Sequence, residues 1–234
     1  MVYVYFSFKG DEDALALSVA QLRRVDAGAQ VFIANDKDAR ARVPEGCREV
    51  LTAYDRGETG KGLAAVRGEL EVFRYVMEIT GEDAVVKIDS DVWCRDVKTV
   101  VEAKGDFVGV EGARALTPMG CFYKISRCAV CFCLEYMERR VRWQAGAYAE
   151  ALTMWHLLAL SRLPLVLVEA GSGLLSGFGL ADGGRGMAPA VLNAALVHCG
   201  EPVRVGGELV RAGRELTLTR MAWLACVDRV AAVV

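Results

Sequence analysis

The chain has 234 residues, which is enough for one α/β domain or for a large domain with a small appendage. It is 53% hydrophobic and has a formal net charge of −2, with acidic and basic residues interspersed. This balance excludes the basic excess that is typical of general nucleic-acid binding, so we expect no nucleic-acid partner.

The chain begins with an apolar run, which predicts a buried strand over residues 2–8. No basic start or cleavage site precedes this run, so we expect no signal peptide. The most apolar later stretch, residues 151–168, is interrupted by His156, Arg162 and Pro164, which makes it a poor transmembrane segment. A cytoplasmic location is the resulting expectation.

Helical and strand patterns alternate through the first part of the chain. After a polar turn at residues 9–13, apolar residues recur at helical spacing and then in short runs. The patterns predict a helix over 14–25, a strand over 29–34, a turn-rich segment over 39–60, a helix over 62–79 and a strand over 84–88. This alternation favours an α/β fold with a mostly parallel central sheet, right-handed crossovers and flanking helices.

The second half of the chain is less regular. Its patterns predict strands over 106–111, 120–126 and 165–169 and helices over 127–141 and 144–161. Residues 171–187 are rich in glycine, which predicts a mobile loop. An apolar run over 190–197 ends at His198, and a mainly apolar element covers 216–234. We expect this last element to pack on its own domain, with docking on another subunit or a membrane surface as the alternative.

Cysteines cluster in the middle of the chain. Cys128, Cys131 and Cys133 follow Cys121, and the whole chain has eight cysteines. A zinc site would need a second paired set at ligand spacing, and the sequence has none. The pattern therefore favours reduced, buried cysteines that behave as small apolar residues.

Two carboxylates, Asp89 and Asp91, follow the predicted strand over 84–88 directly. Burying an isolated carboxylate costs on the order of several kcal/mol. Such groups are therefore usually exposed, hydrogen-bonded or metal-bound. Hard oxygen ligands suit Mg²⁺ or Mn²⁺. Lys9 and Asp36 also follow predicted strands. Because ligands bind at the carboxyl ends of parallel strands, these clusters predict a shared site.

The order of these features resembles a glycosyltransferase of the GT-A fold. The residues that carry the resemblance are Asn35-Asp36, the helix start Gly62-Leu63-Ala64-Ala65-Val66-Arg67, Lys87-Ile88-Asp89-Ser90-Asp91, the strand from Gly120, Glu150 and Val197-His198. The resemblance covers roughly residues 1 to 200, and Asp-x-Asp is its one sharp motif. It implies a single domain with a Rossmann-like GT-A architecture. Residues 1–105 would form a nucleotide-binding half, 106–200 an acceptor half and 201–234 a C-terminal extension through which a homo-oligomer could form.

The resemblance also implies a metal and nucleotide site. Asp91 would be the direct ligand of Mn²⁺ or Mg²⁺, with His198 as a late metal ligand. Asp89 would contact the ribose, or the metal through water. Asp36 would read the base of the nucleotide sugar. Lys9, Arg67 and Lys87 would meet the nucleotide, the last two at the ribose or diphosphate.

The implied reaction transfers a sugar from a nucleotide-sugar donor to a hydroxyl of a sugar or other acceptor. A divalent ion neutralises the leaving diphosphate as a Lewis acid. Glu150 would be the base that accepts the proton of the acceptor hydroxyl. The resembling enzymes commonly have a Glu-Asp pair at that point, whereas Ala151 follows here.

Three other functions fit parts of the pattern. A catalytically degenerate protein of the same fold would bind nucleotide or sugar, or serve as a subunit. Haloacid-dehalogenase-type phosphatases also have Asp-x-Asp after a strand, but near the chain start and followed by Val or Thr where Trp93 stands here. Sugar-nucleotide pyrophosphorylases have a basic, glycine-rich loop after the first strand, which Phe8-Lys9-Gly10-Asp11 does not supply.

Overall fold

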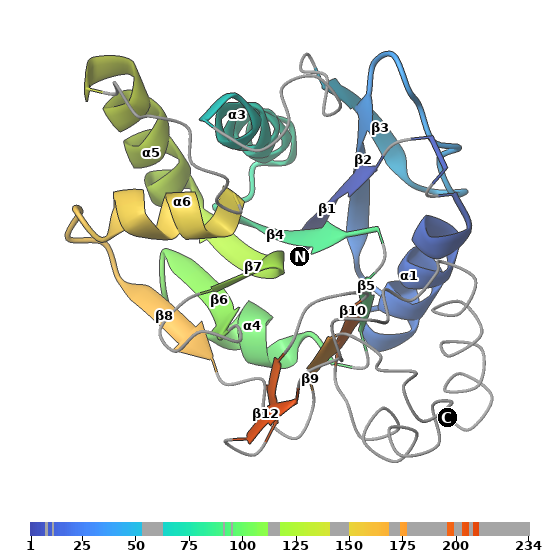
Figure 1. Ribbon diagram of the computed structural model, residues 1–234. Helices are drawn as coiled ribbons and strands as arrows, with labels where there is room; N and C mark the ends of the chain where they lie inside the picture. The colour runs from blue at the N-terminus through green and yellow to red at the C-terminus, as the bar shows by residue number, and fades with distance from the viewer. Residues whose placement is uncertain are drawn as a thin grey trace.

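The protein is described by a computed structural model, and its description covers part of the chain. The described residues are 1–7, 9–10, 12–52, 63–90, 92–94, 96–111, 118–140, 150–168, 174–176, 196–198, 203–205 and 208–210. A seven-stranded sheet lies at the centre, and helices cover both of its faces (Figure 1). The predicted α/β class, with a mostly parallel sheet flanked by helices, is confirmed.

The elements of the first part follow the predicted order. They are β1 (Val2–Ser7), α1 (Glu12–Val25), β2 (Gln30–Asp36), β3 (Arg48–Thr52), α3 (Leu63–Thr80) and β4 (Ala84–Asp89). The strand β3 was not predicted, and it lies within residues 39–60, which were expected to be turn-rich. It lies at one edge of the sheet, where most of its residues are exposed, so it lacks the apolar run that marks a buried strand.

The second half adds β5 (Val92–Cys94), α4 (Lys98–Glu102), β6 (Phe107–Glu111), β7 (Pro118–Ser126), α5 (Arg127–Arg140), α6 (Glu150–Leu158) and β8 (Leu165–Val168). Four short strands follow: β9 (Leu174–Ser176), β10 (Leu196–His198), β11 (Val203–Val205) and β12 (Glu208–Val210). The strand β9 lies inside residues 171–187, so that glycine-rich stretch is not a loop throughout. The predicted element over 216–234 lies outside the described residues.

The strand order of the large sheet is β3-β2-β1-β4-β7-β6-β8. Among these strands only β7 runs against its neighbours, because it pairs antiparallel with both β4 and β6 while the other pairs are parallel. Strands from residues 1–105 and from residues 106–200 therefore belong to one sheet. The carboxyl ends of β1, β2 and β4 lie side by side at one edge of it.

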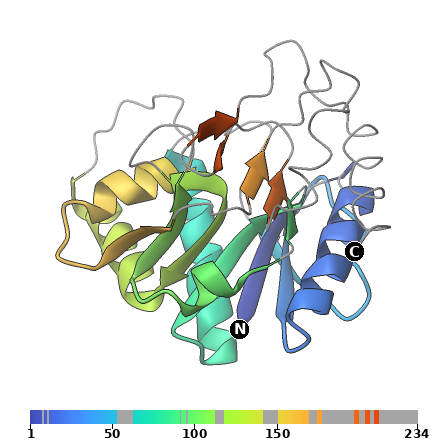
Figure 2. The ribbon, with the colours of Figure 1, turned by 90° about the horizontal axis from the view of Figure 1, so that it is seen from below.

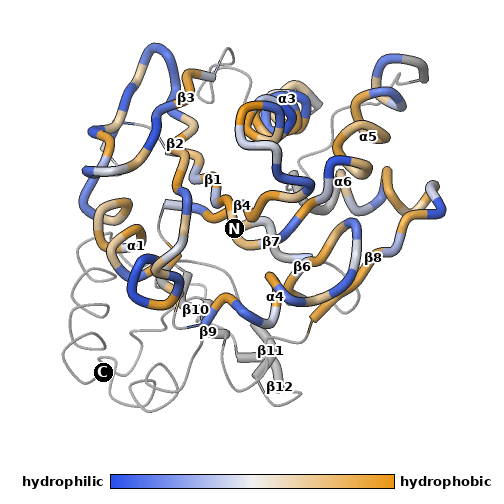
Figure 3. The backbone as a smooth tube through the Cα atoms, turned by 180° about the vertical axis from the view of Figure 1, so that it is seen from behind, coloured by the Kyte–Doolittle hydropathy of each residue, from blue (hydrophilic) through white to orange (hydrophobic). Residues whose placement is uncertain are grey.

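Alternation along β1 explains how the helices are divided between the two faces. Tyr3 and Tyr5 point into one apolar cluster, which is covered by α1 and α4. Val2, Val4 and Phe6 point into a second cluster, which is covered by α3, α5 and α6. Both sides of the strand are buried, and orange, hydrophobic stretches run through the central strands in the hydropathy colouring (Figure 3).

The short strands lie at the carboxyl edge of the large sheet. β1 runs from the N-terminus towards β9 and β10, which sit beyond the ends of the central strands (Figure 2). These two strands form a three-stranded sheet with β5 in the order β5-β10-β9. Segments that lie late in the sequence are thereby brought next to the end of β4.

The clustered cysteines differ in their exposure. Cys121 and Cys133 are buried, but Cys128 and Cys131 are exposed, which corrects the expectation that the whole cluster is buried. The reason is the helix α5, in which residues three apart share one face.

Within the described part of the chain, no helix combines the length and the apolar character needed to cross a membrane.

Candidate nucleotide-sugar and metal site

Lys9 and Asp36 are linked through the backbone at the ends of β1 and β2. The backbone N–H of Lys9 donates to the carbonyl of Ala39 at 2.6 Å. Asp36 Oδ1 accepts from the backbone N–H groups of Asp38 at 2.8 Å and Ala39 at 3.3 Å. The Asp36 carboxylate, which is only 6% exposed, therefore holds the turn after β2, and the backbone of Lys9 is bonded to that turn. Contact of either residue with a nucleotide stays a prediction.

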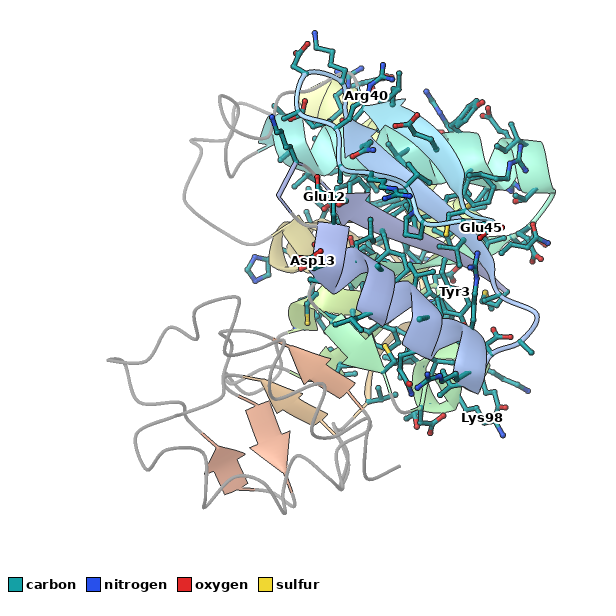
Figure 4. The ribbon with its side chains drawn as sticks, turned by 90° about the vertical axis from the view of Figure 1, so that its right-hand side faces the viewer. Tyr3, Glu12, Asp13, Arg40, Glu45 and Lys98 are labelled. Carbon is teal, nitrogen blue, oxygen red and sulfur yellow. The ribbon has the colours of Figure 1, made fainter. Side chains whose placement is uncertain are left out.

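The turn after β1 also carries acidic residues. Glu12 and Asp13 lie at the start of α1 (Figure 4), where the helix dipole favours negative side chains. Glu12 Oε2 accepts from the backbone N–H of Gly10 at 2.9 Å. Gly10 has a φ of 102°, a left-handed conformation that favours glycine. The start of α1 is therefore fixed by the chain's own carboxylate.

Lys87 and Asp89 form an ion pair at the end of β4. Both side chains point to the α3 face of the sheet because they are two residues apart on one strand. The Lys87 side chain is 2% exposed and that of Asp89 22% exposed. Lys87 Nζ also donates to the carbonyl of Gly120 at 2.6 Å. The observed contacts of Lys87 are with Asp89 and Gly120. Contact of Lys87 with a nucleotide-sugar donor stays a prediction.

Sequence reasoning missed two residues that continue this network. Tyr123 of β7 lies directly opposite Lys87 in the antiparallel register, and Lys87 Nζ is 5.8 Å from the centre of its ring. The Tyr123 hydroxyl donates to Glu69 Oε2 at 3.0 Å, and Glu69 is buried on α3. The available signal was the position of Glu69 three residues after Val66, on the apolar stripe of that helix.

His198 is brought to the end of β4 by strand pairing. In the antiparallel pair of β10 and β5, His198 lies opposite Val92. Val92 follows Asp91 in the sequence, and its carbonyl accepts a hydrogen bond from the Ser18 hydroxyl of α1. Asp91 itself and the side chain of His198 lie outside the described residues, so ligation of a metal by either stays a prediction.

Arg67 lies on the surface of α3. Its side chain is 53% exposed and pairs with Glu71 at 2.9 Å and with Glu138 of α5 at 3.8 Å. The hydrogen bond to Glu71 raises the pKa of Arg67 further above its ordinary value. Arg67 also lines a groove of about 500 Å³ between β3 and α3, together with Thr52 and Tyr75.

Glu150 is the first described residue of α6, which lies within the helix predicted over residues 144–161. The helix packs against α3, α5 and β7, and it begins near the middle of the sheet and ends on the side of β8 (Figure 1). The side chain of Glu150 lies outside the described residues. Its role as a base stays a prediction.

A divalent cation is compatible with the donor atoms at the end of β4. Asp89 supplies carboxylate oxygens there, and hard cations prefer such oxygens. Among the described residues, no group of three or more His, Cys, Asp or Glu side chains is close enough to hold a metal ion. The predicted metal ligands Asp91 and His198 are not included, because their side chains are outside the described residues.

Comparison with known proteins shows a relationship at the level of the fold. No family profile and no curated protein sequence matches this chain. A solved structure, of a glycosyltransferase involved in the glycosylation of the major capsid of PBCV-1, is similar with a TM-score of 0.57 and 10% sequence identity. The similarity covers 97% of this chain and 98% of that one. This chain therefore has the fold of a glycosyltransferase.

Proposed function

We propose that this protein is a metal-dependent glycosyltransferase of the GT-A type. It would transfer a sugar from a nucleotide-sugar donor to an acceptor hydroxyl. The observation that carries the proposal is the register of β10 and β5, which places His198 opposite the residue that follows Asp91. Two predicted metal ligands, more than a hundred residues apart in sequence, thereby belong to neighbouring backbone positions.

The metal would be Mn²⁺ or Mg²⁺, held by Asp91 and His198 with Asp89 facing the donor. When bound, it supplies the positive charge that stabilises the leaving diphosphate. The chain's own residues would bind and orient the rest of the donor. Lys9 would add positive charge at the end of β1, and Asp36 would accept a hydrogen bond from the base.

Arg67 and Glu150 complete the proposed site. The exposed guanidinium of Arg67 lies near the start of α3. Bidentate donors of this kind suit a diphosphate. Glu150 would take the proton of the acceptor hydroxyl, which a carboxylate within hydrogen-bond reach can do.

Calorimetric titration tests the binding part of the proposal. We expect UDP or GDP to bind in the presence of Mn²⁺ and to bind much more weakly after the metal is removed with a chelator. Asp91→Ala should lose the metal-dependent component. Binding that ignores Mn²⁺, or no binding of any nucleotide, would contradict the proposed metal site.

Hydrolysis of a panel of nucleotide sugars tests the catalytic part. We expect one donor to be turned over by the wild-type protein and not by Asp91→Ala. Glu150→Gln should keep Mn²⁺-dependent nucleotide binding and lose transfer to an acceptor. Metal-dependent binding with no turnover of any donor would instead indicate a protein that binds nucleotides without catalysing transfer.

A further inference from the structure

Asp89, the carboxylate at the end of β4, rests on a buried charged network. Lys87 is among the largest fully buried side chains of the described residues, and its ammonium group pairs with Asp89. A buried ammonium is stable only when an acidic partner and hydrogen-bond acceptors replace its water. Here Asp89 supplies the charge and the carbonyl of Gly120 supplies an acceptor at 2.6 Å.

Tyr123 and Glu69 support Lys87 from beneath. The Lys87 ammonium lies 5.8 Å from the centre of the Tyr123 ring, within the range of a cation–π contact. The Tyr123 ring is itself fixed by stacking on Phe107, with ring centres 5.1 Å apart, and its hydroxyl donates to Glu69. The network therefore connects α3, β7 and β4 and leads to Asp89.

We propose that Lys87 is a positioning residue that acts on the donor through Asp89, and that Tyr123 and Glu69 hold Lys87 in place. This inference rests on the proposed function, because it assigns roles within the proposed donor site. The sequence predicted that Lys87 meets the ribose or diphosphate directly. In the role proposed here, Lys87 acts without that contact. The contrast in side-chain exposure supports it, since Asp89 is 22% exposed and Lys87 only 2%.

The ion pair with Lys87 also changes the negative charge that Asp89 presents to a ligand. A carboxylate that is paired with a buried ammonium contributes less net negative charge than an isolated one. Asp89 is therefore suited to accept a hydrogen bond from a donor hydroxyl, while Asp91 and His198 supply the main metal ligation. Its orientation would depend on Lys87 in the way that ligands of metal sites depend on the groups behind them.

A double-mutant cycle tests this inference. The dissociation constant of UDP or GDP with Mn²⁺ is measured for the wild type, Lys87→Met, Asp89→Asn and the double variant. We expect each single variant to bind about 10- to 100-fold more weakly, as for other residues that orient a ligand-binding group. We expect the double variant to bind no more weakly than the weaker single variant, because both changes remove the same interaction.

Lys124→Met is the matched control. Lys124 is a buried lysine on the neighbouring position of β7, and its ammonium donates to the carbonyls of Val101 and Ala103 on the opposite face of the sheet. We expect this variant to melt at a lower temperature and to keep the nucleotide affinity of the wild type. If Lys87→Met does not fold, Lys87→Gln, which keeps a hydrogen-bond donor, replaces it in the cycle.

Tyr123→Phe gives an independent readout of the supporting residues. It removes only the hydroxyl that donates to Glu69, so we expect a smaller loss of affinity that disappears in the Lys87→Met background. Wild-type binding combined with additive losses from Lys87→Met and Asp89→Asn would overturn the inference and restore direct contact. No wild-type binding at all would instead contradict the proposed function, so the two failures are distinguishable.

Discussion

His198 lies opposite Val92 in the antiparallel pair of β10 and β5, although 105 residues lie between them in the sequence. The carbonyl of Val92 is in turn bonded to Ser18 of α1. A residue from the late part of the chain is thereby tied to the end of β4, through a strand that is itself anchored to the first helix. The proposed metal site depends on this pairing.

Replacement of the two histidines of the chain separates metal binding from stability. We expect His198→Ala to weaken Mn²⁺-dependent nucleotide binding by about 10- to 100-fold, because it removes a metal ligand. His156→Ala is the control, since His156 is exposed on α6. Calorimetric titration with and without Mn²⁺ measures both. Equal effects of the two substitutions would contradict the assignment of His198.

Two arginines of α3 provide a similar comparison. Arg67 and Arg74 both pair with a glutamate four residues later, Glu71 and Glu78, and both are about half exposed. Ion pairs between exposed side chains contribute little to stability, so we expect little change in melting temperature from either alanine variant. Only Arg67→Ala should weaken binding of a nucleoside diphosphate. Loss of affinity in both variants would indicate a general charge effect.

The sequence predicted the buried strands well, because β1, β2 and β4 are apolar on both faces. The edge strand β3 begins with Arg48 and Glu49 and has no such run, so hydrophobic patterning could not reveal it. The elements β5 and α4 are only 3 and 5 residues long, too short for a periodic pattern. Patterning thus recovered the core of the fold and missed its exposed and shortest parts.

The candidate site was predictable where it depends on local sequence. Asp89 and Asp36 follow apolar strands, and their location at strand ends was confirmed. The partners of Lys87 were not predictable, because Tyr123 reaches it only through the antiparallel register of β4 and β7. Glu69 reaches Tyr123 only through the packing of α3 on the sheet. The spacing along α3 places Glu69 on the apolar stripe, but it does not identify Tyr123 as its partner.

Asp36 can be tested against a second aspartate that holds a turn in the same way. Asp36 Oδ1 accepts from Asp38 N–H at 2.8 Å, and Asp26 Oδ1 accepts from Gly28 N–H at 3.0 Å. We expect either alanine variant to lose about 1 kcal/mol of stability for each hydrogen bond removed, and Asp26→Ala also removes the acceptor of the Tyr3 hydroxyl. Only Asp36→Ala should also change the preference between UDP and GDP. An unchanged preference would restrict Asp36 to its structural role.

The cysteines should differ widely in reactivity. Cys128 and Cys131 are exposed on α5, whereas burial raises the pKa of the Cys133 thiol to about 12 and also raises that of Cys94. The thiolate is the reactive form. With iodoacetamide at about pH 8, near the ordinary thiol pKa, we expect Cys128 and Cys131 to be modified in the folded protein and Cys94 and Cys133 only after unfolding. Peptide mass spectrometry checks this, and early labelling of Cys133 would contradict the packing of α5.

The two buried tyrosines of β1 predict a loss of stability at alkaline pH. Burial raises the pKa of Tyr3 and Tyr5, and the hydrogen bond from Tyr3 to Asp26 at 2.8 Å adds to the rise. The folded protein therefore keeps both protons while the unfolded chain releases them above about pH 10. Their contribution to stability is complete below that pH and is lost above it, by about 1.4 kcal/mol per pH unit for each tyrosine.

Urea unfolding between about pH 8 and pH 11, on either side of the ordinary tyrosine pKa, measures this dependence. Tyr5→Phe should reduce the loss of unfolding free energy at alkaline pH by the contribution of one tyrosine. It should also cost about 1 kcal/mol at neutral pH, because the Ser18 hydroxyl loses its contact with the Tyr5 oxygen at 3.1 Å. Tyr75→Phe, at an exposed side chain of α3, controls for loss of a hydroxyl. An alkaline fall that is as steep in Tyr5→Phe as in the wild type would contradict the burial of Tyr5 between the sheet and α1.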